Sequence, residues 1–113
     1  MAASAETLSR SAFLIMLALT DRPRHGLAII DRVEESSRGD LKMGPGTLYG
    51  TLQKLTAAGL IREQRHVPDP DDHDTRRRYY GLTPKGERAL RAEAARLRTM
   101  VQAATKQKLF GDI

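Results

Sequence analysis

Cysteine and tryptophan are both absent from this chain of 113 residues, and its aromatic side chains are limited to two phenylalanines and three tyrosines. Without cysteine, the chain can form no disulfide, no thiol nucleophile and no cysteine-ligated zinc site. With so few rings, the core has to be built from Leu, Ile, Val, Met and Ala. Such a core suits packed helices better than a sandwich of strands, so we expect a mainly α-helical fold.

Features of membrane proteins and of enzymes are also scarce. The apolar run from Ala12 to Leu19 is too short to span a bilayer, and it lacks the basic leader and cleavage site of a signal peptide. The three histidines (His25, His66 and His73) are scattered, with no Ser–His–Asp order and no phosphate loop. We therefore expect a cytoplasmic protein that is not an enzyme and needs no cofactor or metal.

Positive charge is in excess along the chain. The formal net charge is +5 at pH 7, and the isoelectric point is near 10.0. A basic surface attracts polyanions over long distances, which favours nucleic acid or an acidic membrane as the partner. Many basic proteins bind neither, so the charge alone does not identify the partner.

Apolar residues at helical spacing predict three helices in the first half of the chain. Residues 1–6 are small and polar, and we expect them to be flexible. A first helix over Leu8–Leu19 is apolar around most of its circumference. A second covers about His25–Ser37, where His25 acts in capping or packing. A third begins near Pro45 and stops at Gly59. The predicted core stripes are Leu27, Ile30 and Val33 in the second helix and Leu48, Leu52 and Leu55 in the third.

The second half predicts a hairpin and a long helix. Two strands, Ile61–Val67 and Arg78–Leu82, flank a polar loop, and Leu41 forms a brief extended contact. Thr83 followed by Pro84 is a strong helix start, and the helix runs to about Leu109. The order indicates a winged helix-turn-helix, with three helices and a two-stranded wing, over residues 7–83. Residues 84–113 then form a C-terminal dimerisation helix.

The third predicted helix has a face suited to the major groove of DNA. At 100° per residue, Leu48 points to the core while Gly46, Gly50, Gln53 and Lys54 point outward. Short residues let the backbone approach phosphates, and Gln53 can read a base edge. An ordinary surface helix whose glycines only form a turn is the alternative. The predicted DNA-contacting residues are Lys42, Gly46, Thr47, Tyr49, Gly50, Gln53, Lys54, Arg76, Arg77 and Arg78.

The predicted wing combines opposite charges. Arg76, Arg77 and Arg78 lie at the base of the loop, where a wing would meet phosphates or a minor groove. The tip, Asp69–Asp74, carries four carboxylates that phosphates would repel. The tip is held off the DNA, binds a cation, or is neutralised by the arginines. The spacing is not that of an EF-hand loop, so a solvated turn is favoured over a metal site.

The last helix carries a narrow apolar stripe. Its basic faces leave three alternatives: folding back on its own domain, lying on an anionic membrane, or pairing with a second subunit. We favour pairing, with the first helix also taking part. Two-fold symmetry would place two recognition helices about 34 Å apart and predict a pseudo-palindromic site. The predicted dimer interface consists of Phe13, Leu90, Ala94, Leu97, Val101 and Ala104.

Several segments together resemble the PadR family of transcriptional regulators. They are Pro23–Gly26, Gly46–Tyr49 with Leu52 and Leu55, Gly59–Ile61 and Tyr79–Gly86, in the right order between about Phe13 and Leu90. The resemblance implies a dimeric, usually repressing DNA-binding protein of the family's short branch with a single C-terminal helix. It also implies that Thr47 and Tyr49 contact DNA and that Arg76–Arg78 lie in the wing.

The sequence departs from this family at several points. Leu27 replaces a frequent tyrosine, Gly50 replaces a frequent proline, and the wing tip is unusually acidic. Some small members bind flat drugs between tryptophans, and the lack of tryptophan puts such a pocket in doubt. A small-molecule effector of unknown identity is a further expectation, with Phe13, Met16 and Met100 as candidate cavity residues that fit an ordinary core better. The alternative function is a protein-interaction module that does not read DNA sequence.

Overall fold

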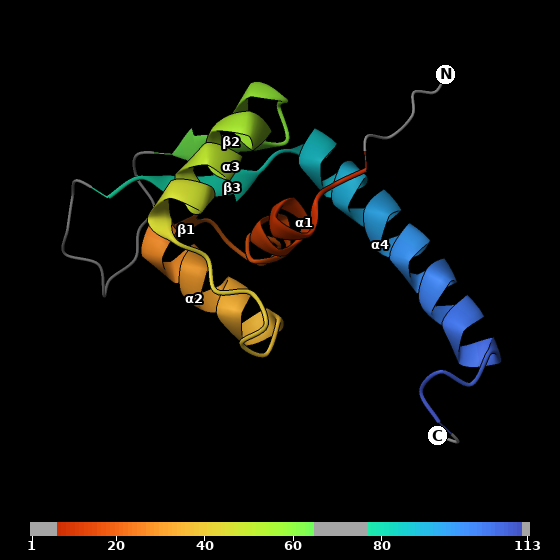
Figure 1. Ribbon diagram of the computed structural model, residues 1–113. Helices are drawn as coiled ribbons and strands as arrows, with labels where there is room; N and C mark the ends of the chain where they lie inside the picture. The colour runs from red at the N-terminus through yellow and green to blue at the C-terminus, as the bar shows by residue number, and fades with distance from the viewer. Residues whose placement is uncertain (1–6, 65–76, 112–113) are drawn as a thin grey trace.

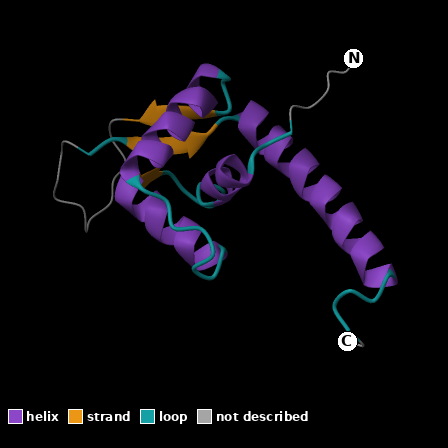
Figure 2. Cartoon of the chain, in the orientation of Figure 1, coloured by secondary structure: helices purple, strands orange, loops and turns teal. Residues whose placement is uncertain are grey.

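Three short helices, a small sheet and one long helix follow each other along the chain. The computed structural model describes residues 7–64 and 77–111. In Figures 1 and 2 the first three helices and the sheet form one body, from which the last helix reaches away. The mainly helical winged-helix prediction is therefore confirmed. The elements are α1 (Arg10–Leu17), β1 (Arg24–His25), α2 (Gly26–Ser36), α3 (Pro45–Ala57), β2 (Ile61–Gln64), β3 (Tyr79–Leu82) and α4 (Pro84–Lys106).

The sheet has three antiparallel strands in the order β1-β3-β2. β2 pairs with β3 from Ile61 opposite Leu82 to Gln64 opposite Tyr79. The expectation of only two strands was wrong, because β1 adds Arg24 opposite Tyr80. A strand of two residues has no alternating pattern by which the sequence could reveal it. The extended contact expected at Leu41 is also wrong: Leu41 is in no strand and is half-buried against the core.

Side-chain caps begin three of the four helices. The Ser9 hydroxyl accepts a hydrogen bond from Ala12 N at 3.0 Å, and the Thr83 hydroxyl accepts one from Gly86 N at 3.0 Å. His25 caps α2, because its Nδ1 accepts from Ala28 N at 3.3 Å. The capping role expected of His25 and the start expected at Thr83 are both confirmed. Such caps typically stabilise a protein by about 1 kcal/mol each.

The core is mainly aliphatic, as the scarcity of rings predicts, and the buried rings are those of Tyr79 and Tyr80. Leu48, Leu52 and Leu55 of α3 are all buried, as expected from their spacing. Leu27 is not part of the core and is 60% exposed, so its predicted place in the α2 stripe is wrong. The buried residues of α2 are instead Gly26, Ile29 and Val33. The hydrophobic pattern did not indicate Gly26, because glycine has no apolar side chain. Its lack of a side chain is what lets α2 pack closely against Leu48 and Tyr49 of α3.

Only the first part of α4 packs on the rest of the protein. Gly86, Leu90 and Glu93 are buried, and Glu93 pairs with Arg96. Farther along, Leu97 and Ala104 are half-buried, whereas Val101 is 52% exposed. Figure 1 shows this distal half extending beyond α1. None of the helices in the described part of the chain is both long and apolar enough to cross a membrane.

Candidate nucleic-acid interface

The outer face of α3 is exposed along its whole length. Leu48, Leu52 and Leu55 fix the helix in the core, so the residues between them face solvent. Lys42 is exposed in the segment that precedes the helix. The outward orientation expected for this face is therefore observed. Its exposed residues are Gly46, Thr47, Tyr49, Gly50, Gln53 and Lys54.

The N-terminus of α3 is open, unlike those of the other three helices. Its N-cap is Gly44, which has no side chain to cap the helix, and its first turn contains no acidic residue. The first backbone hydrogen bond runs from Leu48 N to Gly44 O at 3.0 Å, so the N–H groups of Gly46 and Thr47 have no acceptor within the helix. These N–H groups and the helix dipole make such an end attractive to phosphate.

Two glycines leave the backbone of α3 bare on this face. A Cβ atom built on Gly46 or Gly50 would have no neighbouring atom within 4 Å. Nothing inside the protein therefore requires glycine at either position. A surface that lies against the helix, such as the wall of a DNA groove, can approach its backbone closely there.

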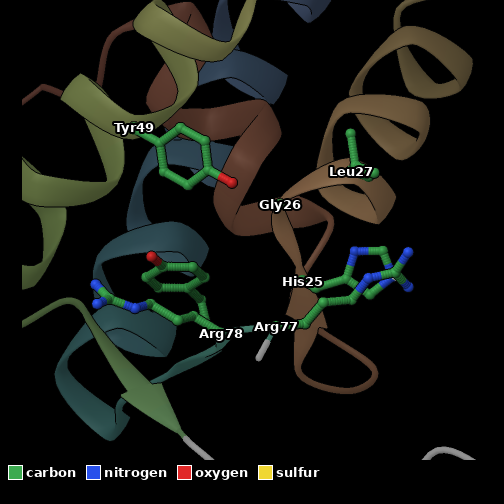
Figure 3. A pocket seen from close by; sticks show the side chains of 7 residues that line it. His25, Gly26, Leu27, Tyr49, Arg77 and Arg78 are labelled. Atoms are coloured by element: carbon green, nitrogen blue, oxygen red, sulfur yellow. The ribbon is translucent and has the colours of Figure 1, made fainter. Parts of the chain in front are cut away.

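Tyr49 bridges α3 and the beginning of α2. Its side chain is half exposed, and a Cβ atom on Gly26 would lie only 2.6 Å from the Tyr49 hydroxyl oxygen. Figure 3 shows the ring extending from α3 with its hydroxyl directed toward Gly26. The lack of a side chain at Gly26 thus leaves room for the Tyr49 phenol between the two helices, where the hydroxyl can donate to a phosphate.

Both wing arginines that the structure describes line a hollow together with this tyrosine. Arg77 Nη1 is 3.2 Å from Nε2 of His25, the residue that caps α2 (Figure 3). Arg78 Nε is 3.4 Å from Glu63 Oε1, in an ion pair whose arginine side chain is 71% exposed. An ion pair so exposed contributes little to stability, which leaves the Arg78 guanidinium accessible to a polyanion. Arg76 and the acidic tip, Asp69–Asp74, lie outside the described residues.

A groove runs between α3 and the sheet, on both sides of Tyr49. Two hollows of about 420 and 500 Å³ share Tyr49, Arg78 and Tyr80 in their walls. Burial, helped by the charge of Glu63, raises the pKa of the Tyr80 phenol above its ordinary value. The first hollow is completed by His25, Gly26, Leu27 and Arg77, and the second by Leu52, Gln53, Thr56, Ala57 and Glu63.

Sequence reasoning did not assign eight residues of this groove to the site: His25, Gly26, Leu27, Leu52, Thr56, Ala57, Glu63 and Tyr80. Leu27 was expected in the core, and only its departure from a family tyrosine marked it. Glu63 comes near Arg78 through the pairing of β2 with β3, and a sequence does not reveal this strand register. Within the described residues, no group of three His, Asp or Glu side chains is placed to hold a metal ion.

A separate apolar groove of about 280 Å³ lies between α1 and α4. It contains Phe13, Leu90 and Ala94, three of the residues expected at a dimer interface. Met16 is fully buried in the core, as the preferred interpretation had it, and Met100 is 58% exposed; neither is in the groove wall. The other residues of the wall are Leu17, Thr20, Leu82, Glu87 and Arg91.

The helical body with its three-stranded sheet, the exposed third helix and the long terminal helix together form a winged helix-turn-helix fold. The model of the transcriptional regulator PadR-like family matches residues 15–92. The chain belongs to this family, which confirms the resemblance noted in its sequence.

Several known proteins are similar to this chain in sequence or in fold. Over 57 residues it is 42% identical to the transcriptional regulator Rv3488 of Mycobacterium tuberculosis, covering 50% of each. Over 81 residues, 72% of this chain, it is 40% identical to an uncharacterized 37.1 kDa protein in transposon TN4556 of Streptomyces fradiae, of which it spans only 21%. A PadR family transcription regulator from Clostridium difficile shares the fold, with a TM-score of 0.71 at 21% identity over 87% of this chain and 97% of that one.

Proposed function

We propose that this chain binds an operator in double-stranded DNA as a homodimer and thereby represses transcription. The observation that carries the proposal is the outer face of α3, where an uncapped N-terminus and the bare Gly46 and Gly50 lie beside Tyr49 and Gln53. These features suit a helix that enters the major groove. The DNA-contacting set then comprises Lys42, Gly46, Thr47, Tyr49, Gly50, Gln53, Lys54, Arg76, Arg77 and Arg78.

The chemistry of these residues supports different roles in phosphate binding, helix positioning and base reading. Arg77, Arg78 and Lys54 neutralise phosphates, a contact that does not depend on sequence. The N–H groups at the start of α3 and the Tyr49 hydroxyl position the helix on the backbone. Gln53, on the same face one turn beyond Tyr49, is the side chain suited to reading a base edge. The net charge of +5 assists the approach to DNA.

The dimer is proposed from the exposed apolar stripe of α4. A helix of 23 residues is about 34 Å long, and its distal half presents Val101 and Met100 to solvent. Pairing with a second copy would cover these residues and Leu97, Ala94 and Ala104. It would also cover Phe13 and Leu90 in the groove between α1 and α4. Two-fold symmetry then predicts a pseudo-palindromic operator.

Three finer points belong to the same proposal. The protein works in the cytoplasm, where its operator is, without catalysing a reaction. Residues 7–83 form the DNA-binding part, and residues 84–113 form the dimerisation part, which contains α4. An effector molecule would relieve repression by binding between the helices that join the subunits.

Selection of bound duplexes from a random DNA pool at near-physiological salt tests the proposal. We expect enrichment of an inverted repeat. The variant Arg78→Ala should weaken binding to all sequences and reduce the slope of log K against log salt by about one unit. Gln53→Ala should instead relax the preference at particular base pairs, so the two variants control for each other. Absence of DNA binding would overturn the proposal and favour a protein-interaction module, since winged helices also serve in protein docking.

A further inference from the structure

The C-terminal end of α3, the proposed recognition helix, is in direct contact with the start of α4. Three successive carbonyl groups, those of Ala58, Gly59 and Leu60, follow the last turn of α3, where Gly59 has a φ of 76°. Each of them accepts a hydrogen bond from one of the two residues Thr83 and Lys85. We call the contacts of Thr83, Lys85 and Gly86 with these carbonyls the α3–α4 clamp.

Thr83 makes hydrogen bonds both to the start of α4 and to the segment that follows α3. Its hydroxyl donates to Gly59 O at 2.6 Å while accepting from Gly86 N at 3.0 Å. Its backbone N–H donates to Leu60 O at 3.1 Å. The same side chain therefore caps α4 and holds the segment that ends α3.

Lys85 and Gly86 complete the contact without leaving any space between the helix ends. Lys85 Nζ donates to Ala58 O at 2.9 Å, so an exposed lysine satisfies a carbonyl at the C-terminus of α3. A Cβ atom on Gly86 would lie 1.9 Å from Leu60 O. The backbones are therefore in direct contact at Gly86. The contact between the two helix ends therefore consists of backbone atoms and hydrogen bonds, and it adds to the packing of α4 on α1 and β3.

The length of α4 makes this angle important. Over about 34 Å of helix, a tilt of about 10° at the clamp displaces the far end by about 6 Å. The far end is the part of α4 that leaves its own domain (Figure 1). A change in the angle between α3 and α4 would therefore move α3 relative to the α3 of a paired subunit.

Resting on the proposed function, we infer that Thr83, Lys85 and Gly86 are positioning residues that fix the angle between α3 and α4 and so set the spacing of the two DNA half-sites. None of the three needs to touch DNA. Their effect is on how sharply the dimer distinguishes one half-site spacing from the next, and not on how each α3 reads its own half-site.

The first test measures the angle without DNA. Because the chain has no cysteine, Ala57→Cys in α3 and Gln102→Cys in α4, both at exposed positions, accept two spin labels. Labelled protein diluted with an excess of unlabelled protein reports the distance within one chain by double electron–electron resonance. We expect a narrow distribution in the parent and a clearly broader one after Thr83→Val with Lys85→Met. Equal widths would overturn the clamp, whether or not the protein binds DNA.

The second test measures half-site spacing. Duplexes carry the two selected half-sites separated by a series of spacings, and affinity is measured for each. Thr83→Val with Lys85→Met should reduce the discrimination between the best spacing and a neighbouring one by about tenfold, which is about 1.4 kcal/mol. Binding to a single half-site should be unchanged. Unchanged spacing discrimination despite a broadened label distance would overturn the inferred role.

A matched control separates positioning from stability. Ser9→Ala removes a cap of the same kind from α1, where the hydroxyl bonds Ala12 N. It should lower stability to a similar extent but leave both the label distance and the spacing discrimination as in the parent. Lys85→Met alone, at an exposed side chain, keeps the test decisive if the double variant folds poorly. It should give a smaller change in the same direction.

Discussion

The glycine at the start of α2 and the two exposed glycines of α3 differ in what surrounds them. At the start of α2, Gly26 is buried, and a Cβ atom there would meet the Tyr49 hydroxyl at 2.6 Å and Leu48 Cδ2 at 3.2 Å. On α3, Gly46 and Gly50 are exposed, and a Cβ atom would meet nothing within 4 Å. Packing thus accounts for the first glycine. It does not account for the other two, although glycine inside a helix costs about 1 kcal/mol relative to alanine.

The difference indicates which parts of the surface serve the fold and which serve a partner. The α2 N-terminus is closed by the imidazole of its own N-cap, His25, and by Tyr49. The α3 N-terminus has neither a side-chain cap nor a neighbour over its glycines. A helix end that is open in the free protein is understandable if a phosphate backbone completes it.

The largest effect is expected at a glycine that packing requires most strongly. In Gly86→Ala the new methyl group would lie 1.9 Å from the backbone oxygen of Leu60, which no side-chain rotation can relieve. We expect the free energy of unfolding to fall by about 3 kcal/mol, at the upper end for overpacking. Urea denaturation measures it. A loss below about 0.5 kcal/mol would show that the helix ends are not in the contact described.

A smaller effect is expected at Gly26, because its nearest neighbour is the end of a side chain. Gly26→Ala should displace the Tyr49 ring and lower the free energy of unfolding by about 1 to 2 kcal/mol. Tyr49→Phe removes the oxygen that the methyl group would meet, so the double variant should lose less than the sum of the single losses. Denaturation of all four proteins gives the coupling. Strict additivity would contradict the packing of Tyr49 on Gly26.

Much of the fold was predictable, because the local sequence signals for helices agree with the packing that the core requires. The leucines of α3 and the Thr83–Pro84 start of α4 each satisfy both, and the structure places them as predicted. β1 was missed because two residues are too short for a pattern. Leu27 was misplaced because the α2 stripe beginning at Leu27 and the one beginning at Gly26 both fit helical spacing, and only packing decides between them.

The candidate site was predictable along α3 and less so across the groove. Counting 100° per residue placed Gly50 and Gln53 on the exposed face, since a helix has a fixed period. The opposite wall depends on strand register, which brings Glu63 and Arg78 together. It also depends on the cap that brings His25 toward Arg77. Such long-range pairings are determined by the tertiary fold and leave no local signal.

The smallest change in stability, and the one opposite in sign, is expected on the bare face of α3. Gly50→Ala adds one methyl group in open space inside a helix, so the free energy of unfolding should rise by about 1 kcal/mol. The same methyl group would stand between the helix backbone and DNA. We expect the affinity for the selected operator to fall by tenfold or more, about 1.4 kcal/mol.

Measuring stability and operator affinity together for the parent and Gly50→Ala tests the central claim most directly. Ala95→Ser, another change of one heavy atom, at an exposed position of α4 outside the candidate interface, serves as the control and should leave the affinity nearly unchanged. A protein that becomes more stable and binds its operator at least tenfold more weakly is the predicted result. Unchanged or tighter binding by Gly50→Ala would contradict the account, because the bare face of α3 would then not be the surface that meets DNA.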